Sequence, residues 1–522
     1  MIGAHKRTGI GLIVIVALLT AWNLAQAAPG DNLLEDPGFE DGPWPQSPAW
    51  PGEIASVPEG ARSGERAGKL VATERDGTHE ATIYSGYVDA TVGLRYRFVI
   101  HAKGEGILSL RSIQLRSDPE DRYIIERPDN HMELSDEWQQ IAIEIAPTDP
   151  LVRSIAAVVH LDGEGARAFL DDAVLTVMGL PGGELTVTPG YAMTAPGKSV
   201  SFRLAAGCDE GPITEGSVSI MMAAGGQTRR ETVAITGETT TWQFDAPAEA
   251  EIGQMTVSFT NADAGVGATA WVDVVDAETW AQFDTAAQAA EIDTPAHILF
   301  LGDSLTDLFR GHNYTDMVGF WLQRAHGDVT YRNAGVGGDF ITRVWRRMTD
   351  PENAYRGEMY DGLYEPTPTH VFIWLGHNDS KLKPRPEYES PEDYEFDPVV
   401  PLDTFEETFV QAIERIRENA PAAEITIVSA SSSVHEICRD RVANRIAEGE
   451  SGGSYFGKPD VLEQFNAAMQ EIAQQTGSGY LDVYTPTKTH PDKPSLFTAD
   501  GVHINDAGNR LVAMIILRYV RK

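Results

Sequence analysis

The sequence predicts two β-sandwich domains followed by an α/β domain whose parallel sheet is covered by helices on both faces. The 522 residues are too many for one compact core. Between residues 31 and 276, short stretches of alternating apolar and polar residues are separated by Gly, Pro and Asp, which is typical of sandwich strands. After Pro295, buried strands alternate with amphipathic helices, which indicates a parallel sheet.

The composition argues against several classes of protein. The chain has 41 Lys and Arg against 77 Asp and Glu, a net charge of −36, so neither nucleic acid nor an anionic membrane surface is an expected partner. Hydrophobic residues make up 42% of the chain, too many for a disordered protein. Two cysteines, Cys208 and Cys438, cannot form a disulfide scaffold or a Cys-rich metal site. They fall in different predicted domains, so a bridge between them is not favoured.

The first residues have the pattern of a secretory signal. Basic residues 5–7 are followed by an apolar run, residues 10–22, which is shorter than the roughly 20 residues needed to span a bilayer. Ala25-Gln26-Ala27 then gives a small-x-small cleavage pattern. We expect residues 1–27 to be removed, leaving a secreted protein, extracellular or periplasmic, without membrane insertion. An uncleaved anchor is the alternative.

Residues 31–178 are predicted to form the first sandwich. Residues 32–40 and 169–175 resemble the two ends of carbohydrate-binding modules of the galactose-binding jelly-roll type. The resemblance implies a structural calcium near the end strands, for which Glu40, Asp171 and Asp172 are candidate oxygen donors. Carboxylates at strand ends are more commonly just solvated, so this site is an open expectation.

Exposed aromatic rings would be needed to bind a sugar, because the apolar face of a pyranose stacks on them. The aromatic residues of this segment include Tyr84 and Tyr87. Trp138 is expected in the core. Trp44 and Trp50, in a Pro-rich stretch, are better candidates for exposure, although core packing is the more common role.

Residues 179–276 continue the alternation and suggest an immunoglobulin-like sandwich. They contain no motif that indicates chemistry, so a spacer is the default interpretation. Residues 277–294 are rich in Ala, Thr and Gln and are predicted to be a linker that could be helical.

Four loops of the C-terminal segment carry candidate site residues where parallel strands end or where the last helix begins, which is where such folds place their sites. They are residues 302–307, 333–339, 376–379 and 500–503. These blocks, in this order, resemble the SGNH (GDSL-type) hydrolase family, which is named for a Ser, a Gly, an Asn and a His. The resemblance covers residues 295–522 and implies a flavodoxin-like three-layer domain with a parallel sheet of about five strands.

The residue types in these blocks suit nucleophilic catalysis. The hydroxyl of Ser304 needs a base to take its proton, and His503 is the candidate. Asp500 can hold the imidazole in the right tautomer and stabilise the cation that forms. By resemblance, the oxyanion is met by the backbone N–H groups of Ser304 and Gly338 and by the side-chain amide of Asn378.

Other polar residues of the blocks have simpler expected roles. Asp303 is expected to brace the turn and Asp307 a helix start, whereas His377 could either touch substrate or pack. No cofactor is expected for catalysis, since the 13 histidines show no His-x-x-x-His or Cys-pair spacing and no phosphate loop with a following Lys is present.

The favoured hypothesis is an esterase that removes acetyl groups from a polysaccharide. The signal, the sugar-module resemblance and a Gly-His-Asn-Asp third block like that of rhamnogalacturonan acetylesterases support it. A binding module would raise the local concentration of the catalytic domain at a polymer.

A lipase, lysophospholipase or arylesterase of the same family is the alternative, and a catalytically dead adhesion protein is disfavoured by the complete set of motif residues. Insertions at residues 380–402 and 433–458 leave substrate size open, and the oligomeric state stays unknown.

Overall fold

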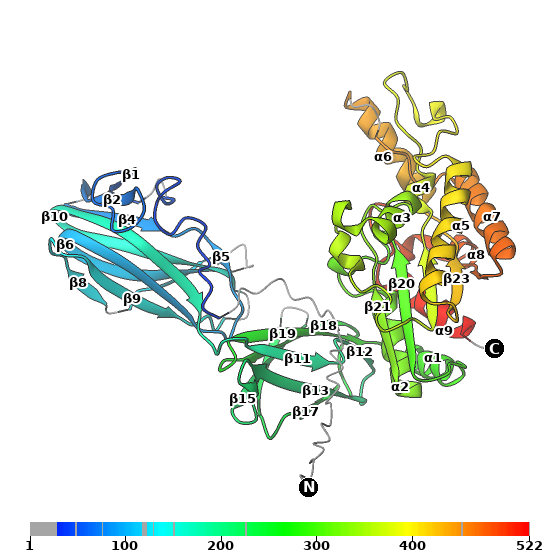
Figure 1. Ribbon diagram of the computed structural model, residues 1–522, viewed down its shortest axis with the longest axis horizontal. Helices are drawn as coiled ribbons and strands as arrows, with labels where there is room; N and C mark the ends of the chain where they lie inside the picture. The colour runs from blue at the N-terminus through cyan, green and yellow to red at the C-terminus, as the bar shows by residue number, and fades with distance from the viewer. Residues whose placement is uncertain are drawn as a thin grey trace, which may run out of the picture.

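The computed structural model shows a β-rich N-terminal half and an α/β C-terminal half (Figure 1). The expected signal peptide lies outside the described residues. No described helix is long and apolar enough to cross a bilayer. The structure describes the whole chain except residues 1–28, 47–49, 76, 117–122, 129, 150–151, 225–226, 450–452 and 521–522.

The first unit is built on two long antiparallel strands, β6 (Tyr96–Arg116) and β10 (Val152–Val177). Register shifts along β10 mark irregularities that bend a strand and increase its twist, and all strands of the unit join in one ten-stranded sheet. Alternate residues point inward, as the buried isoleucines of β9 show. The remaining strands are β1 (Glu53–Val57), β2 (Ala67–Val71), β3 (Thr73–Arg75), β4 (Thr78–Tyr84), β5 (Val88–Asp89), β7 (Tyr123–Glu126), β8 (His131–Glu133) and β9 (Gln139–Ile145).

The tryptophans of this unit are placed differently from one another. Trp44 is buried in the core, with its ring 4.7 Å from that of Phe39. The prediction that Trp138 lies in the core is wrong. This residue comes directly before β9, is half-buried, and has the ammonium of Lys103 4.8 Å from its ring centroid. Trp50 is also half-buried.

The second unit has a four-stranded and a five-stranded sheet whose apolar residues share one core. Phe202 of one sheet packs against Phe259 of the other at 5.8 Å between ring centroids. Both cysteines of the chain are free thiols. The first sheet contains β11 (Glu184–Thr188), β13 (Ser199–Cys208), β14 (Gly211–Pro212) and β17 (Thr240–Asp245), and the second β12 (Tyr191–Thr194), β15 (Ser217–Ala224), β16 (Gln227–Ala234), β18 (Gly253–Asn261) and β19 (Val266–Val274).

The C-terminal domain contains a five-stranded parallel sheet in the order β21-β20-β22-β23-β24. Every residue of β20 is buried, and neighbouring residues belong to opposite cores: Phe300 to one cluster, Leu301 to the other. The sheet is therefore covered on both faces, as a parallel sheet requires. Its strands are β20 (Ala296–Gly302), β21 (Val329–Asn333), β22 (His370–Trp374), β23 (Glu424–Val428) and β24 (Gly479–Leu481).

Helix α5 (Leu402–Asn419) packs against α3 (Ile341–Thr349) and α7 (Pro459–Thr476). Helix α2 (Tyr314–His326) packs against α9 (Asp506–Tyr519) and α1 (Ala277–Gln288). Helix α1 lies within the segment predicted as a linker, yet it is docked on the domain through Phe283 and Trp321. The shorter helices are α4 (His377–Ser380), α6 (His435–Ala447), α8 (Tyr484–Lys488), and the 3-10 turns η1 (Leu308–Arg310), η2 (Pro351–Asn353), η3 (Gly357–Tyr360), η4 (Pro391–Asp393) and η5 (Lys493–Leu496).

A packed contact centred on His312 joins the second unit to the C-terminal domain. The imidazole stacks on Tyr191 at 5.3 Å and lies 5.2 Å from the ring of Trp271. Its Nε2 is 2.8 Å from Nε2 of Gln254 and 3.5 Å from a carboxylate oxygen of Asp273. Burial acts to lower the pKa of His312, but the Asp273 carboxylate outweighs it, so this pKa is raised.

The stability of this contact should therefore depend on pH. Because the pKa of His312 is raised in the folded protein, the protonated imidazole stabilises the folded state. This stabilisation is complete below about pH 6.5, the ordinary histidine pKa, and is lost as the pH rises through the pKa of the folded state. We expect the melting temperature of the full chain to fall over that range, and His312→Gln to flatten the fall. Thermal unfolding at a series of pH values measures both, with His490→Gln as the matched control. Equal pH profiles for His312→Gln and wild type would contradict the assignment.

Candidate active site

The four predicted loops meet at the C-terminal edge of the parallel sheet. The first three follow β20, β21 and β22, and the fourth precedes α9. The carboxyl ends of parallel strands lie at one edge, so residues far apart in sequence converge there. The hydrogen bond between Ser304 and His503 spans 199 positions of the chain.

The side chains of Ser304, His503 and Asp500 are joined by hydrogen bonds. Nε2 of His503 lies 2.8 Å from Oγ of Ser304, and Nδ1 lies 2.5 Å from Oδ2 of Asp500. A carboxylate can only accept, so Asp500 holds the imidazole with its proton on Nδ1 and leaves Nε2 to accept from the serine hydroxyl. The structure thus brings together all three residues that the sequence predicted for the nucleophile, base and orienting carboxylate.

Asp500 is fixed in its ionised form. Its Oδ1 accepts the backbone N–H groups of Val502 and His503, each at 2.9 Å. Burial acts to raise the pKa of Asp500, but the hydrogen bonds from the His503 ring and from these two N–H groups outweigh it. The pKa is therefore held well below its usual range. The charge needed to stabilise an imidazolium is present throughout the neutral range.

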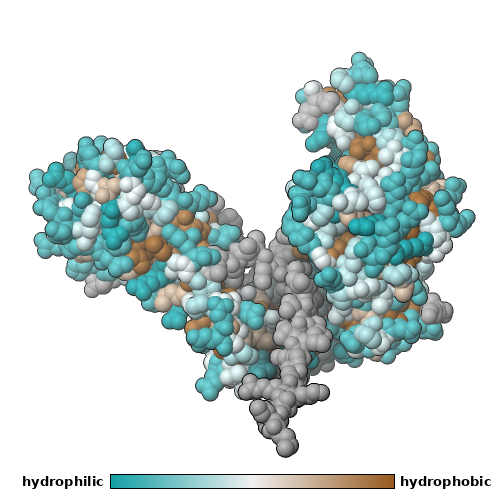
Figure 2. Space-filling model, viewed as in Figure 1, coloured by the Kyte–Doolittle hydropathy of each residue, from teal (hydrophilic) through white to brown (hydrophobic). Residues whose placement is uncertain are grey.

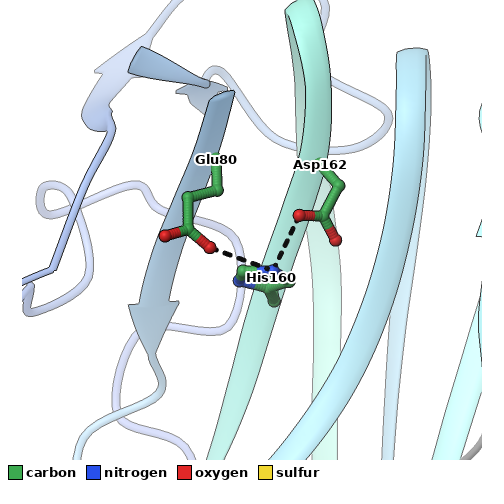
Figure 3. Close-up of side chains that lie close together, drawn as sticks. All are labelled: Glu80, His160 and Asp162. Atoms are coloured by element: carbon green, nitrogen blue, oxygen red, sulfur yellow. Dashed lines mark hydrogen bonds and ion pairs between the residues drawn. The ribbon is translucent and has the colours of Figure 1, made fainter. Parts of the chain in front are cut away.

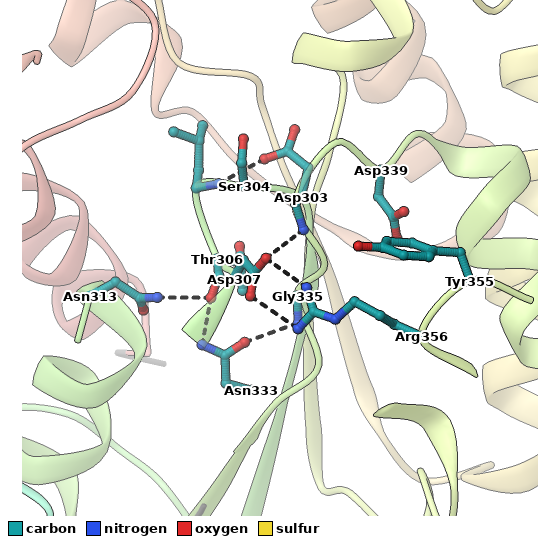
Figure 4. A network of polar contacts seen from close by, with 12 residues as sticks. Asp303, Ser304, Thr306, Asp307, Asn313, Asn333, Gly335, Asp339, Tyr355 and Arg356 are labelled. Carbon is teal, nitrogen blue, oxygen red and sulfur yellow. Dashed lines mark hydrogen bonds and ion pairs between the residues drawn. The ribbon is translucent and has the colours of Figure 1, made fainter. Parts of the chain in front are cut away.

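Ser304 is half-buried between two buried neighbours, Asp303 and Leu305. Oδ1 of Asp303 accepts the N–H of Leu305 at 2.9 Å, which confirms that Asp303 braces the turn. The side-chain amides of Asn313 and Asn333 both donate to the carbonyl of Thr306, at 2.8 and 2.5 Å (Figure 4). These bonds hold the turn so that the serine hydroxyl faces His503.

Asp307 directly precedes the 3-10 turn η1, as predicted for a residue at a helix start, and its carboxylate has a further role. Its Oδ2 accepts the N–H of Gly337 at 2.7 Å. The carboxylate also pairs with Arg356 at 2.9 Å (Figure 4). The carboxylate therefore ties the Ser304 loop to the Gly338 loop. The sequence could not show this, because a carboxylate just before a short turn is equally compatible with a helix cap.

The expected oxyanion donors are arranged as follows. Within the described residues, no hydrogen-bond acceptor is found for the N–H of Ser304 or Gly338, which leaves both available. Gly338 has a φ of +80°, a left-handed conformation that glycine adopts without strain. The amide of Asn378 is oriented on both sides, since Nδ2 donates to Oδ2 of Asp303 at 3.2 Å and Oδ1 accepts from Lys381 at 3.3 Å. One N–H of Asn378 remains for a ligand.

Two buried ionisable side chains, Asp379 and His377, form hydrogen bonds that hold the loop after β22. Asp379 accepts the N–H groups of Ile341 and Gly376, at 2.8 and 3.1 Å, and burial raises the pKa of Asp379 to about 7. His377 is buried, and its Nε2 contacts Oγ of Ser431 at 3.0 Å. Burial, and secondarily the charge of His503, lower the pKa of His377 to about 4. Of the two roles considered for His377, the structure favours packing.

The candidate calcium residues lie around one loop of the N-terminal unit. Oδ2 of Asp171 accepts the N–H of Arg62 at 2.7 Å, Oε1 of Glu40 accepts the N–H of Glu65 at 3.0 Å, and Asp172 pairs with Arg62. The carboxylates already stabilise this loop through backbone donors. Calcium binding stays a prediction.

A different cluster could offer three metal-ligating atoms among the residues that the structure describes: Glu80, His160 and Asp162 (Figure 3). Nε2 of His160 lies 3.0 Å from Asp162 and 3.6 Å from Glu80, and Nδ1 is 2.8 Å from Oγ1 of Thr82. Burial, followed by the charge of Arg111, lowers the pKa of His160. Both ring nitrogens of His160 already have hydrogen-bond partners, Thr82 and Asp162, so we interpret the cluster as a polar network.

Comparison with known proteins identifies the C-terminal domain. Residues 300–511 match the model of the GDSL-like lipase/acylhydrolase family. This segment is a GDSL-like acylhydrolase domain. It contains Ser304, Gly338, Asn378, Asp500 and His503, and the family supports ester hydrolysis. The comparison with curated proteins found no match.

Similar solved structures cover the two ends of the chain. The lipase/acylhydrolase from Enterococcus faecalis is 20% identical over 43% of this chain and 95% of its own, with a TM-score of 0.31. A putative GDSL-like lipase from Parabacteroides merdae is 17% identical over 44% and 99%, with a TM-score of 0.32. The module TmCBM61 in complex with β-1,4-galactotriose is 21% identical over 28% and 99%, with a TM-score of 0.21.

Proposed function

We propose that the protein is a secreted serine esterase that hydrolyses acetyl esters on a polysaccharide through an acyl-Ser304 intermediate. The proposal includes an architecture of two sandwiches and a flavodoxin-like three-layer domain. The observation that carries the chemistry is the hydrogen-bonded chain from Asp500 through His503 to Ser304. It lies next to backbone N–H groups for which the described residues provide no acceptor.

The geometry suggests the following steps. Oγ of Ser304 attacks the ester carbon while Nε2 of His503 takes its proton, and the Asp500 carboxylate stabilises the imidazolium. The carbonyl oxygen, now negative, accepts from the oxyanion donors. The bond between the carbonyl carbon and the sugar oxygen then breaks while His503 gives its proton to that oxygen. His503 next takes a proton from a water molecule, which attacks the acyl carbon. The bond to Oγ of Ser304 breaks, His503 returns the proton to Oγ, and acetate is released.

The N-terminal unit supports a polysaccharide as the substrate. In the register between β4 and β10, Tyr84 lies opposite Val158, Thr82 opposite His160, and Glu80 opposite Asp162. Side chains two positions apart share a face, so Tyr84 lies on the same face as the polar cluster of Figure 3.

Two more aromatic rings lie next to Tyr84 at one end of this face. The ring of Trp50 is 5.7 Å away and that of Tyr87 is 5.6 Å away, and Tyr87 is 40% exposed. Aromatic rings beside hydrogen-bonding side chains suit a sugar, which has both an apolar face and hydroxyl groups.

One experiment tests both the esterase activity and the binding of polysaccharide by the N-terminal unit. Acetate release is measured from an insoluble acetylated polysaccharide and from p-nitrophenyl acetate, for wild type and for Trp50→Ala/Tyr87→Ala. We expect wild type to act on both, and the variant to lose roughly tenfold or more on the polymer alone, because tethering raises the effective concentration. Tyr123→Ala removes an exposed ring from β7 and is the matched control. Equal losses on both substrates would contradict the binding role.

A lipase or arylesterase of the same family is the second candidate, since the family model itself includes lipases. On the face shown in Figure 2, hydrophilic residues dominate and hydrophobic residues form small separate groups. Among the described residues of the acylhydrolase domain, the exposed large hydrophobic side chains are Tyr355 and Phe396. A lipid substrate predicts activity that rises with acyl chain length, whereas an acetylesterase loses activity beyond the shortest esters.

A further inference from the structure

The second unit carries a carboxylate, Asp273, that is buried outside the unit's own core. Asp273 lies on β19 between Val272 and Val274, which are both buried. Successive residues of a strand point to opposite faces of the sheet, so Asp273 points away from the core that contains Val272. Only 2% of the Asp273 side chain is nevertheless exposed. A buried carboxylate is costly unless it is paired, and a spacer has no need of one on its outer face.

The C-terminal domain supplies the partner of this carboxylate. Nε2 of His312 lies 3.5 Å from Oδ1 of Asp273, and only 6% of the His312 side chain is exposed. The hydroxyl of Tyr191 donates to Oδ2 of Asp273 at 2.8 Å. Gln254, which lies opposite Asp273 in the register of β18 and β19, places its Nε2 2.8 Å from Nε2 of His312. Side chains from β12, β18 and β19 therefore surround one imidazole of the C-terminal domain.

Apolar packing encloses this polar contact. The ring of Phe320, on α2, lies 6.0 Å from that of Tyr191, and β12 lies beside α2 (Figure 1). Apolar residues of both units belong to one buried cluster. Apolar packing alone fits several relative positions of two surfaces, whereas a buried polar network satisfies its partners in one arrangement. The contact therefore fixes His312, just before α2, relative to the second unit.

The two residues that follow His312 hold the turn that carries the nucleophile. Nδ2 of Asn313 donates to the carbonyl of Thr306 at 2.8 Å (Figure 4). The hydroxyl of Tyr314 lies 2.9 Å from Oγ1 of Thr306. Thr306 is fully buried and comes two positions after Ser304. A displacement of His312 would therefore shift two of the side chains that fix the Ser304 turn.

The same segment, residues 312–314, contacts the helix that follows His503. The backbone N–H of Tyr314 donates to Oδ1 of Asn509, on α9, at 3.1 Å. Helix α9 begins three residues after His503. The distance of 2.8 Å between Oγ of Ser304 and Nε2 of His503 depends on where the turn and this helix lie. Residues 312–314 are thus placed to connect the second unit with both.

We propose that the second unit is part of the esterase, and that His312 is a positioning residue that keeps the Ser304 turn at hydrogen-bonding distance from His503. The inference rests on the proposed esterase function and replaces the spacer role expected for residues 179–276. A displacement of about 1 Å in an active site costs about 100-fold in rate. The Ser304 turn is also held by Asn333, so the loss of His312 should cost less, about tenfold.

The test measures kcat per active site in the full chain. Active sites are counted by complete reaction with an ester-mimicking phosphonate, and kcat and KM are then measured with p-nitrophenyl acetate, well below the melting temperature of each variant. We expect His312→Gln and Asp273→Asn each to reduce kcat per active site about tenfold, with KM changed less than about twofold. The double variant should lose no more than either single variant, because the two residues act as one unit.

A milder variant and a control accompany these two. Gln254→Ala removes one contact of His312 and leaves the buried carboxylate its partners, so it tests the inference even if His312→Gln fails to fold. Its kcat per active site should fall about threefold. The matched control is His326→Gln at the other end of α2, where Nε2 of His326 lies 2.9 Å from the carbonyl of Ala287. This change removes a contact between α2 and α1 and should leave kcat per active site unchanged.

The outcomes separate the inference from the esterase proposal. A kcat per active site equal to that of wild type in every variant that folds would show that the contact only stabilises the protein, and would overturn the inference. Losses that multiply in the double variant, or an equal loss in His326→Gln, would overturn it as well. Wild type that neither hydrolyses p-nitrophenyl acetate nor reacts with the phosphonate would overturn the esterase proposal itself.

Discussion

Ser304→Ala should abolish the hydrolysis of acyl esters, with a loss in kcat of about 10⁶-fold, because among the described residues the hydroxyl of Ser304 is the one hydrogen-bonded to His503. Oγ of Ser304 lies 2.8 Å from Nε2 of His503, and the methyl of alanine has nothing for the imidazole to deprotonate. Steady-state kinetics with p-nitrophenyl acetate and with an acetylated glycan measure the loss.

The control for this variant is Ser495→Ala. Ser495 is an exposed serine of the same domain whose Oγ donates to the carbonyl of Asp492 at 2.7 Å. Its removal should leave activity unchanged, and both variants should keep the melting temperature of wild type to within a few degrees. Substantial turnover by Ser304→Ala would show that the nucleophile lies elsewhere.

Asp500→Asn should have the second largest effect, about 10⁴-fold in kcat, with KM little changed. An amide can donate to Nδ1, which would place the imidazole proton on Nε2 and point it at Ser304, so that the base becomes unavailable. The same substitution also removes the charge that stabilises the imidazolium. Adding Asp500→Asn to Ser304→Ala should cost almost nothing further, because residues that act as one unit do not contribute additively.

The prediction for Asp500→Asn assumes that the substitution leaves the position of His503 and its hydrogen bond to Ser304 unchanged. Asp500 also accepts two backbone N–H groups, from Val502 and His503. Asp500→Glu keeps the charge but moves it along a longer side chain, and it should recover part of the activity that Asp500→Asn loses. A double variant whose loss equals the product of the two single losses would contradict a shared role.

The location of the site could be predicted from the sequence because two simple rules act together. Parallel strands deliver their following loops to one edge, which places Ser304 and Asn378 together, and a spacing of three residues lets Asp500 reach His503 within one loop. The change from alternating to helical periodicity near Pro295 likewise predicted where the α/β sheet begins. These features are local in sequence or follow from sheet topology.

What could not be predicted depends on contacts between distant segments. Nothing in the sequence around Arg343 distinguishes it from Arg347, yet Arg347 is buried against Asp339 and Arg343 is exposed beside Gly338. In the same way, the role of His312 depends on rings contributed by another unit, and the placement of Trp138 depends on how the turn before β9 is packed. Periodicity predicts which face of an element is buried, and it carries no information about which partner arrives there.

The central claim is that Ser304 becomes covalently acylated, and intact-protein mass spectrometry after reaction with an ester-mimicking phosphonate tests it most directly. We predict one adduct per chain, located by peptide fragmentation on residue 304, formed at the rate at which activity is lost, and absent in Ser304→Ala. Full loss of activity with the adduct on another residue, or full labelling of residue 304 with activity retained, would contradict it.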